Sequence, residues 1–249
     1  MWQDVVDLRD FYDTQLGDMT RRMVRRAIRS LWPSVAGQSV LGLGYATPYL
    51  RQFVPEAERV LAFMPATQGV VHWPTDGRGL TALIDDTELP LPDCSVDRVL
   101  LVHAIENGEY QRDMLREIWR VLTGDGRLMV VAPNRRGIWA RLERTPLGWG
   151  HPYSKAQLSR LLRDNMFTPT RSARALFMPP TRSRTLLRSA PAWERIGSRW
   201  FPTISGVVVL EAGKQLYASS LRPTRRRFAR PIVVPFPQSA RPASQRSKP

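Results

Sequence analysis

The stretch Val40-Leu41-Gly42-Leu43-Gly44-Tyr45-Ala46-Thr47-Pro48 decides the fold of this chain, because it combines a short apolar run with a glycine turn. A buried strand that ends in glycines, which tolerate positive φ and allow close backbone approach, is typical of the first strand of an open α/β sheet. Only Gly42 and Gly44 supply that freedom, since Ala46 and Pro48 stand where further glycines are expected. The stretch therefore predicts an α/β sheet whose first turn is poor in glycine.

On both sides of this stretch, short apolar runs rich in branched residues alternate with amphipathic segments. This pattern predicts a mostly parallel sheet with helices on both faces. We expect helices over residues 17–31, 111–122 and 154–165, with Ser154 as the N-cap of the last. Strands are expected over 39–43, 59–63, 80–84, 98–102, 127–132 and 205–210, the last of them beside 127–132 or at the sheet edge. Residues 179–188 are expected to form an exposed loop.

Composition favours a globular protein. The 249 residues are 43% hydrophobic, enough for one α/β domain with a sizeable core, and no apolar run approaches the roughly 18 residues that cross a bilayer. The single cysteine, Cys94, excludes an internal disulfide, and the three histidines lack metal-ligand spacing. The N-terminus is acidic where a secretory signal would be basic. We therefore expect a cytoplasmic protein with no membrane span and no metal.

The formal net charge of +15 lies almost wholly in the second half of the chain. Residues 1–133 carry a net charge of −4, whereas residues 134–204 carry 14 basic and 3 acidic residues. Residues 222–249 add eight basic residues and six prolines, so we expect a disordered basic tail. A nucleic-acid-binding domain more often spreads its charge over one folded face. Nucleic acid is therefore not the expected partner, while a protein partner for 137–204 or the tail stays open.

Two later motifs carry a resemblance to a known family. The segment Leu89-Pro90-Leu91-Pro92-Asp93-Cys94-Ser95-Val96-Asp97 and the segment Arg116-Glu117-Ile118-Trp119-Arg120-Val121-Leu122-Thr123-Gly124-Asp125-Gly126 follow the glycine turn in order. Together they resemble the class I S-adenosylmethionine-dependent methyltransferases, in particular the type 11 subgroup, over about residues 35–170. The resemblance implies a Rossmann-like sheet with S-adenosylmethionine across the carboxyl ends of its strands.

The resemblance also implies how the chain is divided. Residues 1–34 are expected to form an N-terminal helical cap or lid, and residues 35–221 the methyltransferase-like domain. Within that domain, residues 137–204 are interpreted as a substrate-side insertion or cap, because tryptophans and arginines are interleaved there. The basic tail over 222–249 completes the chain.

The family pattern assigns cofactor-binding positions to the strand ends. Gly42, Gly44 and Tyr45 match the first turn, although Gly42 stands where the family usually has an acid. Met64 replaces the acid that normally binds both ribose hydroxyls after the second strand. Hydrogen bonds to a charged group are worth about 1.5–3 kcal/mol, so this replacement is expected to weaken binding by about tenfold to a hundredfold.

Other positions carry the remaining expected contacts. Asp85 matches the acid that contacts the adenine amino group, and Asp86 beside it is able to substitute. Tyr12 stands at the lid position, where it either donates to the methionine carboxylate or anchors its helix to the core. His103 follows the fourth strand and is the candidate general base, or else a packed histidine. Glu106 either caps the following helix or acts on substrate.

Two functions remain open from the sequence. The first is S-adenosylmethionine-dependent methyl transfer to an unidentified acceptor, a small molecule or a protein. The alternative is a catalytically degenerate methyltransferase-like protein that binds or regulates, since fold alone does not confer activity. The reduced glycine turn and Met64 favour the alternative, whereas Asp85 and His103 favour the enzyme.

Overall fold

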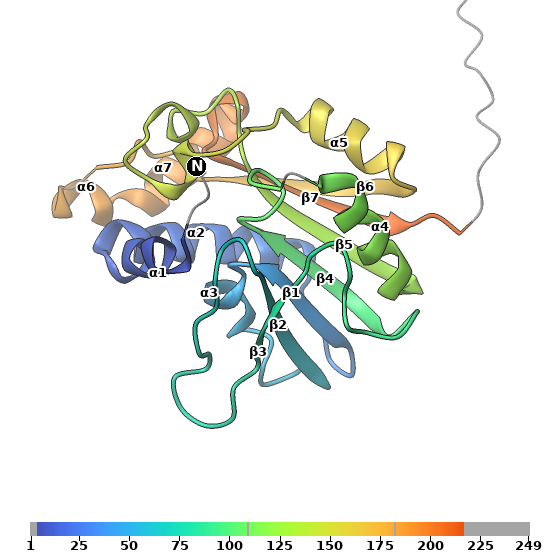
Figure 1. The fold of residues 1–249 in the computed structure, drawn as a ribbon. Helices are drawn as coiled ribbons and strands as arrows, with labels where there is room; N and C mark the ends of the chain where they lie inside the picture. The colour runs from blue at the N-terminus through green and yellow to red at the C-terminus, as the bar shows by residue number, and fades with distance from the viewer. Residues whose placement is uncertain (1–3, 109, 182, 217–249) are drawn as a thin grey trace, which may run out of the picture. The chain divides into compact units, whose positions relative to one another are not determined.

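The computed structural model describes residues 4–108, 110–181 and 183–216, which form a seven-stranded sheet with helices on both faces (Figure 1). The strand order is β3-β2-β1-β4-β5-β7-β6, and β7 runs in the direction opposite to the other six strands. This is the predicted α/β class with a Rossmann-like sheet. The strands are β1 (Ser39–Gly44), β2 (Arg59–Pro65), β3 (Thr81–Ile84), β4 (Val96–Val102), β5 (Leu122–Pro133), β6 (Phe167–Ala175) and β7 (Val207–Lys214).

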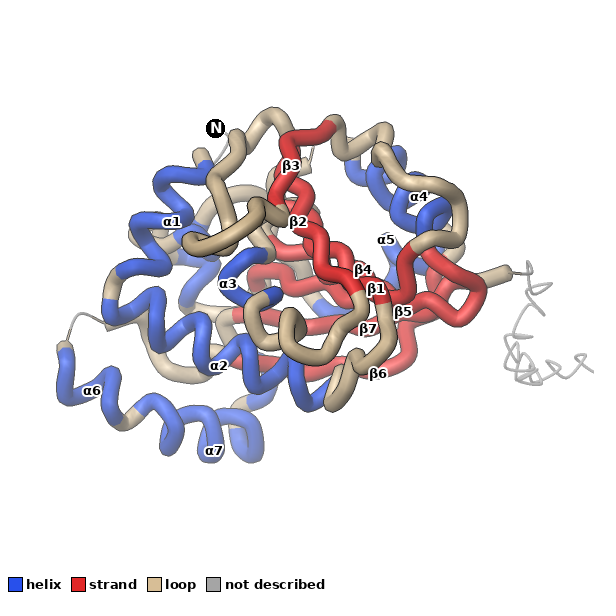
Figure 2. The backbone as a smooth tube through the Cα atoms, turned by 90° about the horizontal axis from the view of Figure 1, so that it is seen from below, coloured by secondary structure: helices blue, strands red, loops and turns tan. Residues whose placement is uncertain are grey.

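Along each buried strand, alternate side chains pack into two separate hydrophobic cores, one on each face of the sheet. In β4, Leu100 and Val102 pack toward one face, and Val99 and Leu101 toward the other. The first face is covered by α1 (Val5–Asp13), α2 (Gln15–Leu31) and the short α3 (Thr47–Leu50), with α6 (Arg184–Arg188) and α7 (Ala190–Trp200) beside α2 (Figure 2). The second face is covered by α4 (Gln111–Val121) and α5 (Lys155–Asp164).

The first helix, α1, lies within the expected N-terminal cap. Asp4 caps it by accepting a hydrogen bond from the Val6 amide at 2.8 Å. Val5, Leu8 and Tyr12 follow at helical spacing and are all buried. Their burial directs α1 onto the carboxyl ends of the central strands, where the family places its cofactor.

Residues 137–204 differ from the simple insertion that the sequence suggested. Residues 155–164 form α5 and residues 167–175 form β6, so both belong to the layers of the sheet. Two connections remain outside these layers, one between β5 and α5 and one between β6 and β7. The second contains α6 and α7, and α6 occupies part of the expected exposed loop over 179–188. The strand expected over 205–210 is β7, and it lies beside β5, which is one of the two positions expected for it.

Four further sequence expectations concern the basic tail, the single cysteine, metal binding and membrane spans. The basic tail over 222–249 lies outside the described residues. Cys94 is a free, exposed thiol. Within the part of the chain that the structure describes, no group of histidine, cysteine and acidic residues has the arrangement of a metal site. None of the described helices has the length and apolar character that crossing a membrane requires.

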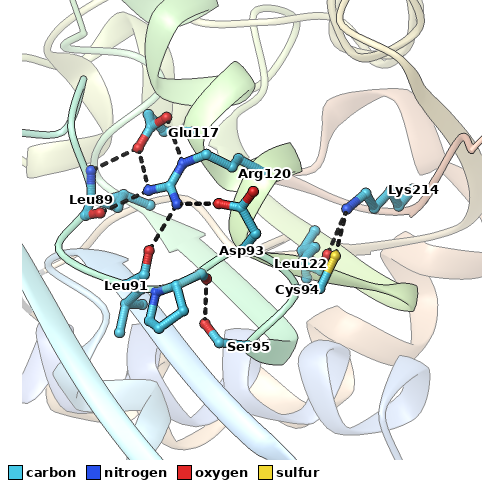
Figure 3. A network of polar contacts seen from close by, with 10 residues as sticks. Leu89, Leu91, Asp93, Cys94, Ser95, Glu117, Arg120, Leu122 and Lys214 are labelled. Carbon is cyan, nitrogen blue, oxygen red and sulfur yellow. Dashed lines mark hydrogen bonds and ion pairs between the residues drawn. The ribbon is translucent and has the colours of Figure 1, made fainter.

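Arg120 of α4 ties the loop before β4 to that helix (Figure 3). Its guanidinium donates to the carbonyls of Leu89 at 2.9 Å and Leu91 at 2.8 Å, and to the Asp93 carboxylate at 2.7 Å. It also donates to both carboxylate oxygens of Glu117, which in turn accepts from the Leu89 amide. The hydrogen bond from Arg120 is the main reason that the pKa of Glu117 is lowered. This network explains why the 89–97 and 116–126 motifs occur together.

We expect Arg120→Ala to lower the free energy of unfolding by about 2 kcal/mol, because several charge-assisted hydrogen bonds are lost and two carbonyls lose a donor. For a domain of this size, that loss corresponds to a fall in Tm of about 4–8 °C. The matched control is Arg116→Ala on the same helix, since its side chain is 78% exposed and makes only a 3.8 Å ion pair with Asp113. Thermal and urea unfolding measure both variants, and an equal effect of the two would contradict the assigned role.

The same pair of proteins tests the pH dependence of the network. The pKa of Glu117 is lower in the folded protein than in the unfolded chain. Its contribution to folding stability is therefore complete above the ordinary glutamate pKa of about 4.3, and it is lost as the pH falls through the pKa of the folded state. The difference in stability between wild type and Arg120→Ala is therefore expected to shrink from about pH 7 toward about pH 3. A difference that stays constant over this range would show that Glu117 contributes nothing through Arg120.

Candidate functional site

The candidate site lies where β1 and β4 end, beneath α1. Gly44 has φ of +80°, and a Cβ there would lie 2.2 Å from the Val102 carbonyl oxygen. A Cβ on Gly42 would lie 2.5 Å from Leu50 of α3. Both glycines are therefore required by contacts within the protein itself. The expected glycine turn is present, but the space beside each glycine is filled by the chain.

Tyr12 connects α1 to this turn. Its hydroxyl lies 2.8 Å from the hydroxyl of Tyr49 and 2.8 Å from Nε2 of His103, and its ring stacks on Tyr45 with centroids 5.7 Å apart. The side chain is only 4% exposed. Burial, with a further contribution from Tyr49, raises the pKa of Tyr12 well above its usual value. Of the two roles expected for Tyr12, this geometry is that of the anchor.

His103 and Glu106 form a buried pair behind Tyr12. Each is 1% exposed, and His103 adopts φ of +53°, which brings its ring under α1. Its Nδ1 lies 3.2 Å from Oε1 of Glu106, close enough for an ion pair when the ring is protonated but without hydrogen-bonding geometry. Neither His103 Nδ1 nor either Glu106 carboxylate oxygen has a hydrogen-bond partner among the described residues.

The expected capping role of Glu106 is wrong. Helix α4 begins at Gln111 with Tyr110 at its N-cap position, several residues after Glu106. The segment between them turns instead, since the Asn107 and Gly108 amides donate to the Ala104 carbonyl. The carboxylate of Glu106 therefore points into the protein and away from the helix start.

Gln68 is a site residue that the sequence analysis missed. Its side-chain amide donates to the backbone carbonyl of His103. Its backbone carbonyl accepts a hydrogen bond from the backbone amide of Val5 at 2.8 Å. It thereby joins the loop after β2 to both α1 and the end of β4. A glutamine in an irregular loop gives no sequence signal for such a role. Tyr49 was also missed, and it lies in the short helix α3 directly after the turn.

The remaining predicted residues lie at the ends of β2 and β3. Met64 is fully buried in the core beneath α1 and α2. Asp85 is exposed, and it accepts hydrogen bonds from the amide and hydroxyl of Thr87, which lower its pKa. Burial raises the pKa of Asp86 beside it. The structure thus brings Tyr12, Tyr45 and His103 into contact, while the two aspartates stand apart from that cluster.

An open hollow of about 650 Å³ flanks the cluster on the α2 side. Tyr12 and Tyr45 line it, together with the loop after β2 and arginines of α2. None of the other residues predicted to bind the cofactor lines it. The hollow therefore meets the predicted site only at its edge.

The residues at the strand ends do not fit S-adenosylmethionine in the position that the resemblance implies. The Gln68 side chain already donates a hydrogen bond to the His103 carbonyl, and the Tyr12 ring stacks on Tyr45 over the turn after β1. Met64 offers no acceptor for a ribose, because a thioether is a poor hydrogen-bonding group. In this arrangement the chain occupies its own expected cofactor site.

Comparison with known proteins shows that part of the chain is similar to methyltransferases. Residues 40–130 match the family model described as a methyltransferase domain. Two Mycobacterium tuberculosis proteins, from different strains and each named a probable S-adenosylmethionine-dependent methyltransferase, are 54% identical over 48 residues. That match covers 19% of this chain and spans 18% of the length of each curated relative.

Solved structures extend the likeness to the whole fold. A Thermotoga maritima S-adenosylmethionine-dependent methyltransferase superposes with a TM-score of 0.60 at 16% identity, covering 85% of this chain and 96% of its own. A Haloferax volcanii methyltransferase, in complex with the activator Trm112, superposes with a TM-score of 0.58 at 19% identity. The match covers 86% of this chain and 100% of that protein. The [4+2]-cyclase SpnF superposes with a TM-score of 0.53 at 18% identity, and the match covers 87% of this chain and 98% of SpnF.

These likenesses agree with the strand order and with the motifs at 89–97 and 116–126. Both curated relatives and the Thermotoga maritima protein are named as S-adenosylmethionine-dependent. The chain therefore has the fold of S-adenosylmethionine-dependent methyltransferases, and its residues 40–130 match the methyltransferase domain model.

Proposed function

We propose that this protein transfers the methyl group of S-adenosylmethionine to an acceptor, and that the arrangement described above is its closed, ligand-excluding form. Support comes from the family match over residues 40–130 and from the strand order. The acceptor is a small molecule or a protein, and we infer a cytoplasmic location. His103, at the end of β4, remains the proposed general base.

The observation that carries the proposal is the buried, unpartnered Glu106 carboxylate beside His103 Nδ1. Buried polar groups in native proteins almost always have a hydrogen-bond partner, and leaving one unsatisfied costs about 1–3 kcal/mol. The pair lies at the carboxyl end of a central strand, which is where open α/β sheets bind ligands. Unsatisfied acceptors there suit a cationic or hydroxyl-bearing ligand.

For such a ligand to reach the pair, α1 and the loop after β2 must move together. Gln68 joins both of them to β4 through the His103 carbonyl and the Val5 amide. Tyr12 adds the second connection, through His103 and Tyr49. These contacts favour the closed form, so each is expected to oppose ligand binding by population shift.

We expect Gln68→Ala to bind S-adenosylhomocysteine about 2- to 10-fold more tightly than wild type. The reason is that a lost hydrogen bond of about 0.5–1.5 kcal/mol no longer holds the closed form. Calorimetric titration with S-adenosylmethionine and S-adenosylhomocysteine measures the effect. Gln15→Ala is the matched control, because it makes the same change at an exposed position of α2, and its affinity should equal that of wild type.

Other outcomes of this titration separate the alternatives. Weaker binding by Gln68→Ala would show that Gln68 contacts the cofactor, and the closed-form interpretation would then be wrong. An absence of heat and of thermal shift at millimolar ligand, in both wild type and Gln68→Ala, would overturn methyl transfer. The catalytically degenerate binding protein, which Met64 and the filled turn favour, would then be the better hypothesis.

Tyr12→Phe is expected to lower the free energy of unfolding by about 1–3 kcal/mol, because Tyr49 and His103 Nε2 lose a buried partner. It should also tighten S-adenosylhomocysteine binding, since it weakens closure. Tyr110→Phe is the control, because Tyr110 is 60% exposed, and its stability should change by less than about 0.5 kcal/mol. If Tyr12→Phe instead weakens binding without loss of stability, Tyr12 is a cofactor ligand and not an anchor.

A further inference from the structure

A second hollow, of about 510 Å³, lies on the α5 face of the sheet. It is bounded by the end of β5, by α5, and by β6 and β7. Its lining includes five basic side chains and no acidic residue. The basic residues are Arg136, Lys155, Arg160, Arg163 and Arg174. The hollow shares no lining residue with the one beside Tyr12 and Tyr45.

Helical spacing on α5 builds one wall of this hollow. Lys155, Ser159 and Arg163 recur every four residues, so they form a single stripe along the helix. The stripe borders Leu158 and Leu162, which are fully buried against the sheet. Its side chains are therefore held at the junction of helix and sheet, where they line the hollow.

The sheet supplies the opposite wall. Arg174 of β6 pairs in register with Val208 of β7, and both residues line the hollow. Val208 belongs to the core that α4 and α5 cover, which fixes the face on which this pair lies. Arg174 is half-buried, so its guanidinium rises from the sheet toward α5. Cations from two elements thus converge on one space.

Asn134 and Ser154 in the lining form hydrogen bonds with other described residues, whereas the basic side chains do not. None of its five basic side chains forms an ion pair or a side-chain hydrogen bond with another described residue. Ser159 is only 7% exposed and lines the hollow, yet its hydroxyl makes no hydrogen bond to any other residue that the structure describes. This hydroxyl is free to serve as a neutral donor among the cations.

The charge pattern selects the kind of ligand. Like charges held together repel one another, and an anion between them removes that cost. Guanidinium groups form bidentate hydrogen bonds with phosphate oxygens. A volume of about 510 Å³ lies in the range of small-molecule sites. The combination suits a compact multivalent anion better than an extended chain.

We propose that this hollow binds the phosphate or diphosphate group of a small phosphorylated ligand. Arg160, Arg163 and Arg174 hold its oxygens, and Ser159 donates the neutral hydrogen bond. The proposal does not rest on methyl transfer, because it concerns a separate face of the sheet and is tested by binding alone.

The test is calorimetric titration of the full chain with pyrophosphate and with inorganic phosphate, at constant ionic strength. We expect saturable binding, tighter for pyrophosphate than for phosphate. Arg160→Ala and Arg163→Ala should each weaken it by about tenfold, since each removes a charge-assisted contact. Arg112→Ala makes the same change of net charge on the exposed surface of α4, outside the hollow, and should leave the affinity within about twofold.

A neutral substitution separates a built site from general attraction. Ser159→Ala leaves the net charge unchanged and should weaken pyrophosphate binding by about threefold, while Ser172→Ala, an exposed serine of β6, should not. Thermal unfolding of each variant checks that it is folded. Equal losses for Arg160→Ala and Arg112→Ala, or no effect of Ser159→Ala, would overturn the proposal. So would a short single-stranded RNA that binds well when pyrophosphate gives no heat, because the surface would then be a nucleic-acid interface.

Discussion

The close approach of β1 and β4 at Gly44 is the constraint on which the site depends. A side chain at this position would collide with the Val102 carbonyl, so only glycine, at positive φ, lets the two central strands end side by side. Because the strands end together, Tyr45 and His103 emerge next to each other and Tyr12 of α1 contacts both. Within the described structure, the glycine that would admit a cofactor in a relative is needed here for packing.

The fold was predictable because its signals are local. Apolar runs marked the central strands, and the motifs around Arg120 encode contacts between neighbouring segments of the chain. Of the elements that were not predicted individually, α1 and β6 were missed for opposite reasons. Helix α1 lies in the segment expected to form a helical cap, and its bounds are signalled by Asp4 followed by Val5, Leu8 and Tyr12 at helical spacing. Strand β6 had little signal, because most of its residues are exposed or half-buried and its position depends on pairing with β7.

The site was less predictable because its contacts join distant parts of the chain. The family pattern identified the correct strand ends, so Tyr12, Tyr45 and His103 were named and do meet. It could not reveal that Gln68 reaches the His103 carbonyl, since that contact depends on the path of an irregular loop. Nor did it show that Glu106 turns inward, although the helical spacing had already placed the start of the next helix at Gln111.

The two faces of the sheet differ in how strongly they require a ligand. The cations around α5 are mostly exposed, so water solvates them and their lack of ion pairs costs little free energy. The Glu106 carboxylate is buried and unpartnered, and a charged group without compensation in the interior is far more expensive. That cost falls when α1 opens and water or a ligand reaches the carboxylate. The same buried pair that fills the core under α1 therefore also favours its opening.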